Sequence, residues 1–329
     1  MPSNPLRRYA HYAKGENWAL VTGATNGMGE EFAHQLAGLG FNVIVHGRNE
    51  TKLTSVKSAI ESKHSGIQVR TIAVDASQLP PKVSEFKALF EELNITVLIN
   101  NVGIVSQNYP LLEEETEQEI LAQLTTNNVF PTLLASVALP HLKQRQPSLM
   151  INMSSLGSWA PAPYLSPYSG AKAYNMYFSR ALYNEMACEK QQVDIVCLAP
   201  GQVVSGMNEG PPTTMMPLAE KWVAKALSSV APGFFSKRPA PVIVPWGPHA
   251  WGVRAMEWMT RSMCDNAVKG VTVDLRNKKR SEKSGEKVQT TSTTKTNGDA
   301  NASTQPQKAD QTESEGTAAP SENTAADHS

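Results

Sequence analysis

Short apolar runs alternate with longer amphipathic stretches through most of this chain of 329 residues. The apolar runs predict strands at residues 18–22, 42–46, 67–73, 95–99, 148–153, 193–198 and 241–244. The amphipathic stretches predict helices at residues 27–39, 50–63, 81–92, 115–143, 167–190 and 218–229. Such alternation predicts an α/β fold, a doubly wound parallel sheet with helices on both faces and ligands at the carboxyl ends of the strands.

A glycine-rich turn follows the first predicted strand. Residues 22–29 read TGATNGMG and lie between the apolar run Ala19–Val21 and the amphipathic stretch Glu30–Leu39. Glycines at such a turn let the backbone approach a pyrophosphate, whose charge is favoured at a helix N-terminus. A glycine-rich turn alone is often only a turn. Its place between a strand and a helix favours a dinucleotide site in a Rossmann-type domain.

A tyrosine and a lysine on one predicted helix are the strongest candidates for chemistry. Tyr168 and Lys172 are about one helical turn apart, so their side chains leave the same helix face, and Ser155 lies upstream. An ammonium group beside a phenol favours the phenolate and is expected to lower the tyrosine pKa from about 10. This pair would exchange a proton with a carbonyl or alcohol oxygen. By itself the spacing is more typical of a solvated helix face.

Two further motifs complete a pattern that extends from residue 17 to about residue 210. Residues 100–103 read NNVG after the apolar run Val97–Ile99, and Pro200-Gly201 follows the last long apolar run. With the glycine-rich turn and the Ser, Tyr and Lys residues, they resemble the ordered motifs of the short-chain dehydrogenase/reductase family. Val102 and residues 46–53 resemble the branch of 17β-hydroxysteroid dehydrogenases and very-long-chain 3-oxoacyl-CoA reductases.

The resemblance implies four catalytic positions. Ser155 matches the serine that hydrogen-bonds the substrate oxygen, and Tyr168 matches the proton donor in reduction. Lys172 matches the residue that binds the nicotinamide ribose and lowers the tyrosine pKa. The fourth member is an asparagine that connects the lysine to water, for which Asn127 and Asn128 are both available. An ungapped alignment of the helix that follows selects Asn127.

The end of the second predicted strand bears on the choice of cofactor. NAD-specific enzymes usually have an acid there for the ribose 2′-hydroxyl, whereas an arginine accommodates a 2′-phosphate. Arg48 occupies the matching position with no acid before Glu50, which favours NADPH over NADH. Alternatively, Arg48 is a surface residue and NAD binds through backbone contacts. Asp75 matches the family residue that bonds the adenine amino group, or it starts a turn.

The resemblance extends to a larger set of cofactor contacts. These are Thr22, Gly23, Thr25, Asn26, Gly27, Met28, Gly29, Arg48, Asp75, Asn101, Val102, Gly103, Tyr168, Lys172, Pro200, Gly201, Val203 and Ser205. Ser205 replaces the threonine that the family usually has after Pro-Gly, a mild change in the contacts to the cofactor carboxamide.

Three segments are candidates for the substrate pocket. Residues 159–165 lie between the catalytic serine and tyrosine and should form a wall, and residues 202–217 lie where the family has its mobile lid. Methionines such as Met215 and Met216 adapt their shape and suit a lipophilic ketone, although core packing explains each of them equally well. Residues 246–263 should cap the pocket, lie on a membrane surface, or pack as a helix or subunit interface.

Composition agrees with a globular enzyme. The chain is 40% hydrophobic and 18% charged, and its formal net charge of +0 gives no electrostatic case for nucleic acid. Cys188, Cys197 and Cys264 have no metal-binding spacing and are expected to be buried thiols in a reducing compartment. No apolar stretch is long enough for a transmembrane helix, unlike the anchored 3-oxoacyl-CoA reductases. We expect a cytoplasmic protein and leave open a peripheral contact with the endoplasmic reticulum.

The predicted organisation is an N-terminal extension at residues 1–16, a catalytic domain at 17–275 and a disordered tail at 276–329. The tail has no aromatic residue and one branched aliphatic residue, Val288, so it cannot bury enough apolar surface to offset its ordering entropy. Its basic cluster Lys278–Arg280 is expected to be a solvated linker rather than a contact with an anionic surface.

These patterns predict an NADPH-dependent carbonyl reductase. The substrate options are a 3-oxoacyl chain, a steroid-like ketone and a specialised-metabolite ketone, each reduced to a secondary alcohol. The alternative is a non-catalytic NADP-binding scaffold or sensor that acts through the tail, and retention of Tyr168 and Lys172 argues against it. The family resemblance also implies a homodimer or homotetramer formed through the helices that bear Asn127 and Tyr168.

Overall fold

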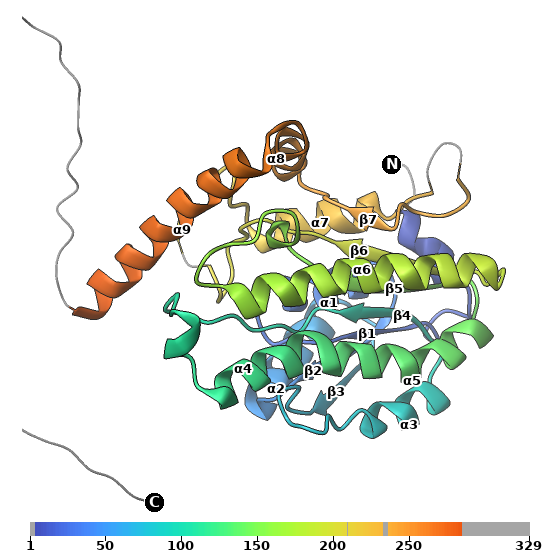
Figure 1. The fold of residues 1–329 in the computed structure, drawn as a ribbon. Coiled ribbons are helices and arrows are strands. Elements are labelled where there is room, and N and C mark those ends of the chain that lie inside the picture. Colours follow the sequence, from blue (N-terminus) through green and yellow to red (C-terminus); the bar gives the residue numbers. More distant parts are fainter. Residues whose placement is uncertain (1–3, 209, 233–235, 285–329) are drawn as a thin grey trace, which may run out of the picture. The chain divides into compact units, whose positions relative to one another are not determined.

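A seven-stranded parallel sheet forms the centre of the computed structural model, which describes residues 4–208, 210–232 and 236–284 (Figure 1). The strand order is β3-β2-β1-β4-β5-β6-β7, so the direction of winding reverses between β1 and β4. The strands are β1 (Trp18–Val21), β2 (Asn42–Gly47), β3 (Val69–Ala73), β4 (Ile95–Asn100), β5 (Ser148–Met153), β6 (Val193–Leu198) and β7 (Val242–Ile243). A ligand crevice is expected at that reversal.

Helices cover both faces of the sheet, as the alternation predicts. They are α1 (Gly27–Gly38), α2 (Glu50–Lys63), α3 (Ser84–Glu92), α4 (Glu117–Leu124), α5 (Phe130–Gln144), α6 (Ser166–Cys188), α7 (Ala219–Ser229), α8 (Gly247–Trp258) and α9 (Arg261–Ser284). Buried side chains of α1, α2 and α7 pack on one face, and those of α3, α5 and α6 pack on the other. The predicted doubly wound α/β fold is therefore confirmed.

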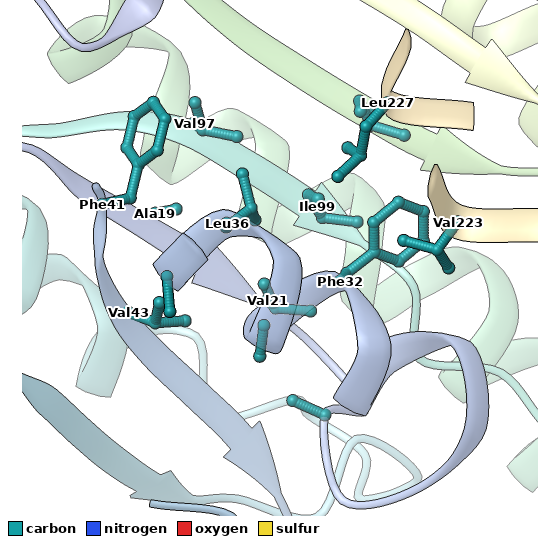
Figure 2. Packing of buried hydrophobic residues seen from close by; sticks show 14 of the residues in the cluster. Ala19, Val21, Phe32, Leu36, Phe41, Val43, Val97, Ile99, Val223 and Leu227 are labelled. Atoms are coloured by element: carbon teal, nitrogen blue, oxygen red, sulfur yellow. The ribbon is translucent and has the colours of Figure 1, made fainter. Parts of the chain in front are cut away.

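The core consists of two apolar layers because successive strand residues point to opposite faces. In β1, Ala19 and Val21 pack under α1 and α7, whereas Leu20 belongs to the opposite layer. Figure 2 shows the first layer, in which Phe32 and Leu36 of α1 lie over the strands. All of these side chains are fully buried. This packing holds the carboxyl ends of β1 and β4, and hence the loops that follow them, in place.

The predicted strands and most predicted helices agree with the structure. Two helical regions and the burial of one cysteine differ from the predictions. The helix predicted at 115–143 is α4 and α5 joined by a π-helical turn, Thr125–Val129. The helices α8 and α9 were not among the predicted helices, although packing as a helix was one reading of residues 246–263. Among the cysteines, Cys197 is buried as predicted, but Cys188 is exposed on the last turn of α6.

The N-terminal extension packs into the catalytic domain. Leu6 and Tyr9, in a short 3-10 helix, are fully buried in the same apolar layer as α1 and α7. The Tyr9 hydroxyl donates a hydrogen bond of 2.8 Å to the buried Asp194 carboxylate of β6. Two apolar residues in a polar segment are a weak sequence signal, so the predicted domain boundary at residue 17 separates residues that share one core.

The C-terminal region is ordered further than predicted. Helix α9 continues past Arg276 to Ser284, so the predicted start of the tail at residue 276 falls inside a helix. Arg276 and Arg280 form ion pairs with Glu114, at 3.7 and 3.0 Å. A segment's apolar composition indicates how much surface it can bury but does not reveal polar contacts of this kind. The predicted disorder of residues 285–329 lies outside the described residues. Across the described helices, none is long and apolar enough to span a membrane.

Candidate active site

The glycine-rich turn forms a tight cradle between β1 and α1. Gly23 and Gly27 have positive φ angles of 63° and 58°, which residues with a side chain rarely adopt. A Cβ atom on Gly29 would lie 2.0 Å from the Gly23 carbonyl oxygen. The turn therefore needs these glycines, and it leaves the first backbone N–H groups of α1 without helical partners, as anion sites require.

The NNVG motif at the end of β4 holds this cradle in place through hydrogen bonds. The Asn101 side-chain amide donates to the carbonyl oxygens of Thr22 and Gly23, at 3.0 and 3.2 Å. The Thr22 hydroxyl accepts hydrogen bonds from the backbone of Asn101 and Val102, at 2.9 and 3.1 Å. Thr22 and Asn101, both predicted as cofactor contacts, therefore position the turn through hydrogen bonds within the protein.

Arg48 and Asp75 lie near each other at the ends of β2 and β3. Arg48 is exposed, and Asp75 accepts two hydrogen bonds from Ser77, at 2.9 and 2.8 Å. Burial raises the pKa of Asp75, but the Ser77 hydrogen bonds and the Arg48 charge more than offset this, so the pKa lies below its usual value. The turn expected as an alternative at Asp75 is present, because the Gln78 backbone N–H donates to the Asp75 carbonyl at 3.3 Å.

His46 is a positioning residue that sequence reasoning did not single out. Its Nδ1 atom accepts a hydrogen bond of 3.4 Å from the Gly23 backbone N–H, and its Nε2 atom donates to the Val74 carbonyl at 3.0 Å. Burial lowers the pKa of His46 to about 4, so the ring is neutral and can serve as the acceptor. A histidine in an otherwise apolar strand was the available signal.

Ser155, Tyr168 and Lys172 converge where β5 ends and α6 begins, as predicted. The Lys172 ammonium lies 5.5 Å from the centre of the Tyr168 ring and donates to the Met153 carbonyl at 3.2 Å. The neighbouring Ser154 points away from the site and bonds the Lys172 carbonyl at 2.7 Å. Ser155 and Tyr168 line one cavity, and this geometry suits proton transfer to an oxygen held there.

The predicted lowering of the Tyr168 pKa is wrong for this structure. Burial raises the pKa of Tyr168 above its ordinary value, and the hydrogen bond with Ser155 only partly counteracts the rise. Burial also lowers the pKa of Lys172, to about 8. Desolvation outweighs charge pairing because both groups are enclosed and the ammonium faces the ring rather than an ionised oxygen. Tyr168 therefore holds its proton at neutral pH and is suited to donate it.

Asn127 lies within the π-helical turn, and its carbonyl faces α6. Pro131 has no N–H to donate to the carbonyl four residues before it, so the Asn127 carbonyl accepts a hydrogen bond of 3.1 Å from Asn175 instead. Asn175 also donates to the Met153 carbonyl, which Lys172 shares. Asn128 instead bonds Ala171 and Asn175. The structure therefore connects Asn127 to Lys172 through Asn175, a residue that the motifs did not include.

The loop that contains the Pro-Gly motif covers one side of the cradle. A Cβ atom on Gly27 would lie 2.9 Å from the Ser205 Cβ atom, so the loop after β6 covers the start of α1. His249 of α8 ties this loop together. Its Nδ1 atom accepts from the Gly201 backbone at 3.1 Å, and its Nε2 atom donates to the Met215 carbonyl at 2.9 Å. His249 thereby links the Pro-Gly motif to the predicted lid.

An apolar cavity of about 430 Å³ opens onto Ser155 and Tyr168. All three predicted segments contribute to its wall, together with α9, which was not predicted. The lining includes Ala160, Ala162, Leu165, Met207, Met215, Met256, Val268, Val271 and Leu275. A second cavity of about 700 Å³ shares part of this wall, Val105–Gln107, and is lined by charged residues that include Glu114 and Lys279. The arrangement suits a ligand with an apolar part and a polar part.

Comparisons with known proteins agree with this geometry. Residues 17–214 match the family model for short chain dehydrogenases. A very-long-chain 3-oxoacyl-CoA reductase of Pyricularia oryzae is 33% identical over 269 residues, which cover 80% of this chain and 78% of that protein. A reductase of the same name from Neurospora crassa is 34% identical over 274 residues, covering 81% of each chain.

Solved structures show the same fold. A short-chain dehydrogenase from Sphingobium yanoikuyae has a TM-score of 0.62 and 21% identity, covering 73% of this chain and 92% of that one. A 7β-hydroxysteroid dehydrogenase has a TM-score of 0.68 and 20% identity, covering 80% of this chain and 99% of that one. With its motifs assembled at one edge of the sheet, the chain belongs to the short-chain dehydrogenase/reductase family of oxidoreductases, in the branch that includes the very-long-chain 3-oxoacyl-CoA reductases.

Proposed function

We propose that this protein uses NADPH to reduce the 3-oxo group of a long-chain acyl thioester to a secondary alcohol. The observation that carries the proposal is the apolar cavity that ends at the Ser155 and Tyr168 hydroxyls. A ketone oxygen between these hydroxyls would leave its hydrocarbon chain among apolar and methionine side chains. The relatives named as 3-oxoacyl-CoA reductases support this choice over a steroid-like ketone.

The residues present fit a dinucleotide phosphate cofactor. The cradle at Gly23, Gly27 and Gly29 leaves no room for side chains where a pyrophosphate would approach. A Cβ on Gly103 would lie 2.9 Å from the Asn127 Oδ1 atom and 3.4 Å from the Lys172 Nζ atom, so the loop that follows β4 approaches both side chains closely. Arg48 would bind the 2′-phosphate, and Lys172 the ribose next to the nicotinamide. Bound NADPH supplies the hydride.

The protein would supply the proton and hold the ketone. Tyr168, a phenol that burial keeps firmly protonated by raising its pKa above the ordinary value, gives its proton to the ketone oxygen while the Ser155 hydroxyl donates a hydrogen bond to the same oxygen. The Lys172 ammonium stabilises the phenolate left behind. Because the Lys172 pKa is lowered to about 8, this lysine can return a proton to Tyr168. Asn127 and Asn175 hold the hydrogen-bonded groups around it.

The reaction can be tested by following NADPH consumption with 3-oxoacyl-CoA thioesters of increasing chain length. We expect kcat/KM to rise with chain length as more of the apolar cavity is filled, by about threefold to fourfold per buried methylene. Steroid ketones form the comparison set. A higher kcat/KM for steroid ketones would indicate that the substrate is a steroid-like ketone rather than an acyl thioester. Absence of turnover across both sets would instead favour the non-catalytic NADP-binding alternative.

Arg48 provides a test of cofactor choice. We expect Arg48→Ala to weaken NADPH binding by about tenfold to a hundredfold and to leave NADH binding nearly unchanged, because only NADPH has the phosphate that the guanidinium can pair. Titration of both cofactors into each variant measures the effect. Lys63→Ala removes the same charge from the far end of α2 and serves as the control. An unchanged NADPH/NADH ratio would mean that Arg48 is only a surface residue.

The end of α9 provides a test of the pocket wall. A chain ending at Leu275 loses the Arg276 guanidinium, which lies 4.1 Å from the centre of the Tyr164 ring, and both ion pairs to Glu114. We expect its KM for the ketone to rise by about threefold to tenfold, since these contacts hold α9 against the cavity. A chain ending at Ser284 keeps the contacts and should match the full chain. Equal KM values for the two truncations would show that α9 holds its place without them.

A further inference from the structure

Helix α8 has apolar side chains on both of its faces. On the inner face, His249 and Val253 are buried and Met256 lines the apolar cavity. The outer face bears Trp251 and Trp258, whose exposed fractions are 73% and 92%. The two tryptophans are seven residues apart and therefore lie on one stripe of the helix. A surface helix normally places polar residues on such a stripe.

Basic and apolar residues continue this outer face. Arg254 and Ala255 lie between the two tryptophans on the same stripe and are exposed. Arg261 is exposed at the start of α9, and Met263 follows it with 54% of its surface exposed. The acidic Glu257 is also exposed but lies on the flank of the stripe. We name Trp251, Arg254, Ala255 and Trp258 the outer face of α8; Arg261 and Met263 are the exposed residues that follow it at the start of α9.

We propose that the outer face of α8 binds the surface of a lipid bilayer that contains anionic headgroups. Tryptophan is enriched at membrane interfaces because its ring is apolar and its N–H is polar, and arginine pairs with lipid phosphates. The two arginines near the tryptophans carry positive charges that complement an anionic surface. A helix that lies in the plane of the interface needs no membrane-spanning segment.

The outer face belongs to a helix that also contributes to the cavity wall. Met256 of α8 and Val271 of α9, the helix that directly follows α8, both line the apolar cavity, and Val271 is 59% exposed. If the proposed function holds, a bilayer bound at α8 would bring acyl chains near the helices that line the cavity. The membrane contact itself does not depend on the reaction.

Vesicle sedimentation of the full chain tests the proposal. One set of vesicles is pure phosphatidylcholine, and the other contains phosphatidylserine at about one part to three. We expect the wild type to bind, with preference for the anionic set. Trp251→Ser with Trp258→Ser should reduce binding to both sets by about tenfold or more, since two interfacial side chains are lost. Arg254→Glu with Arg261→Glu should remove only the anionic preference.

Tyr177→Ser is the matched control, because Tyr177 is 63% exposed on α6, away from α8. It should bind vesicles as the wild type does. Thermal unfolding checks that each variant is folded, and turnover of a short water-soluble 3-oxo substrate checks the reaction separately. The proposal is overturned if the wild type stays in solution or if the double tryptophan variant binds like the wild type. It is also overturned if light scattering shows that the wild type is a dimer and that the double tryptophan variant alone is a monomer, because the outer face would then bind a second copy of this chain.

Discussion

Replacement of Tyr168 by phenylalanine is expected to lower kcat for ketone reduction by about 10²–10⁴-fold while NADPH binds as before. The phenyl ring preserves the contact with Lys172, whose ammonium lies 5.5 Å from the ring centre, but the proton donor is lost. Burial raises the Tyr168 pKa above its ordinary value, so this hydroxyl stays protonated at neutral pH in the wild type, as a phenol does in water. Stopped-flow measurement of NADPH oxidation with saturating substrate gives kcat, and fluorescence titration gives cofactor affinity.

Tyr177→Phe is the matched control on the same helix. Tyr177 is largely exposed on α6, and removal of its hydroxyl should leave kcat within about twofold of the wild-type value. Near wild-type turnover by Tyr168→Phe would exclude Tyr168 as the proton donor. A loss of NADPH binding together with turnover would indicate that the phenol helps to hold the cofactor.

Gly29→Ala is expected to abolish cofactor binding at micromolar NADPH and to destabilise the fold. The new Cβ atom would lie 2.0 Å from the Gly23 carbonyl oxygen and 2.5 Å from the Asn101 side-chain nitrogen. Because the closer atom belongs to the backbone of the turn, the clash can be relieved only if the cradle opens. Overpacking of this kind costs about 1–3 kcal/mol, which corresponds to roughly fivefold to about 150-fold in cofactor affinity if the cradle must open to relieve it.

Gly252→Ala in α8 is the control, since an added Cβ atom there meets no neighbouring atom within 4 Å. It should leave NADPH affinity unchanged and slightly raise the melting temperature, because alanine favours a helix over glycine. NADPH titration and thermal unfolding of both variants measure the two effects. Unchanged NADPH affinity in Gly29→Ala would show that the turn is not the cofactor cradle.

Sequence periodicity and motif order were sufficient to predict the architecture. The central strands of the sheet were located from their apolar runs, because a parallel strand covered on both faces is apolar along its length, whereas the edge strand β3 is only partly buried. The positions of Ser155, Tyr168 and Lys172 were likewise predictable, since the strand end and the helical spacing place them at one edge of the sheet. Local patterns of this kind involve residues that are close in the chain.

Only the tertiary structure decided the features that depend on contacts between distant segments. His46 and His249 bond backbone groups of loops that come from other elements, and no spacing rule connects them. The rise in the Tyr168 pKa follows from how much of the chain encloses it. The ion pairs that Arg276 and Arg280 of α9 form are with Glu114, far away in the sequence. Sequence patterns therefore determined the sheet and the residue types that meet at its edge. Burial and long-range polar contacts between distant segments determined how those residues are protonated, held and enclosed.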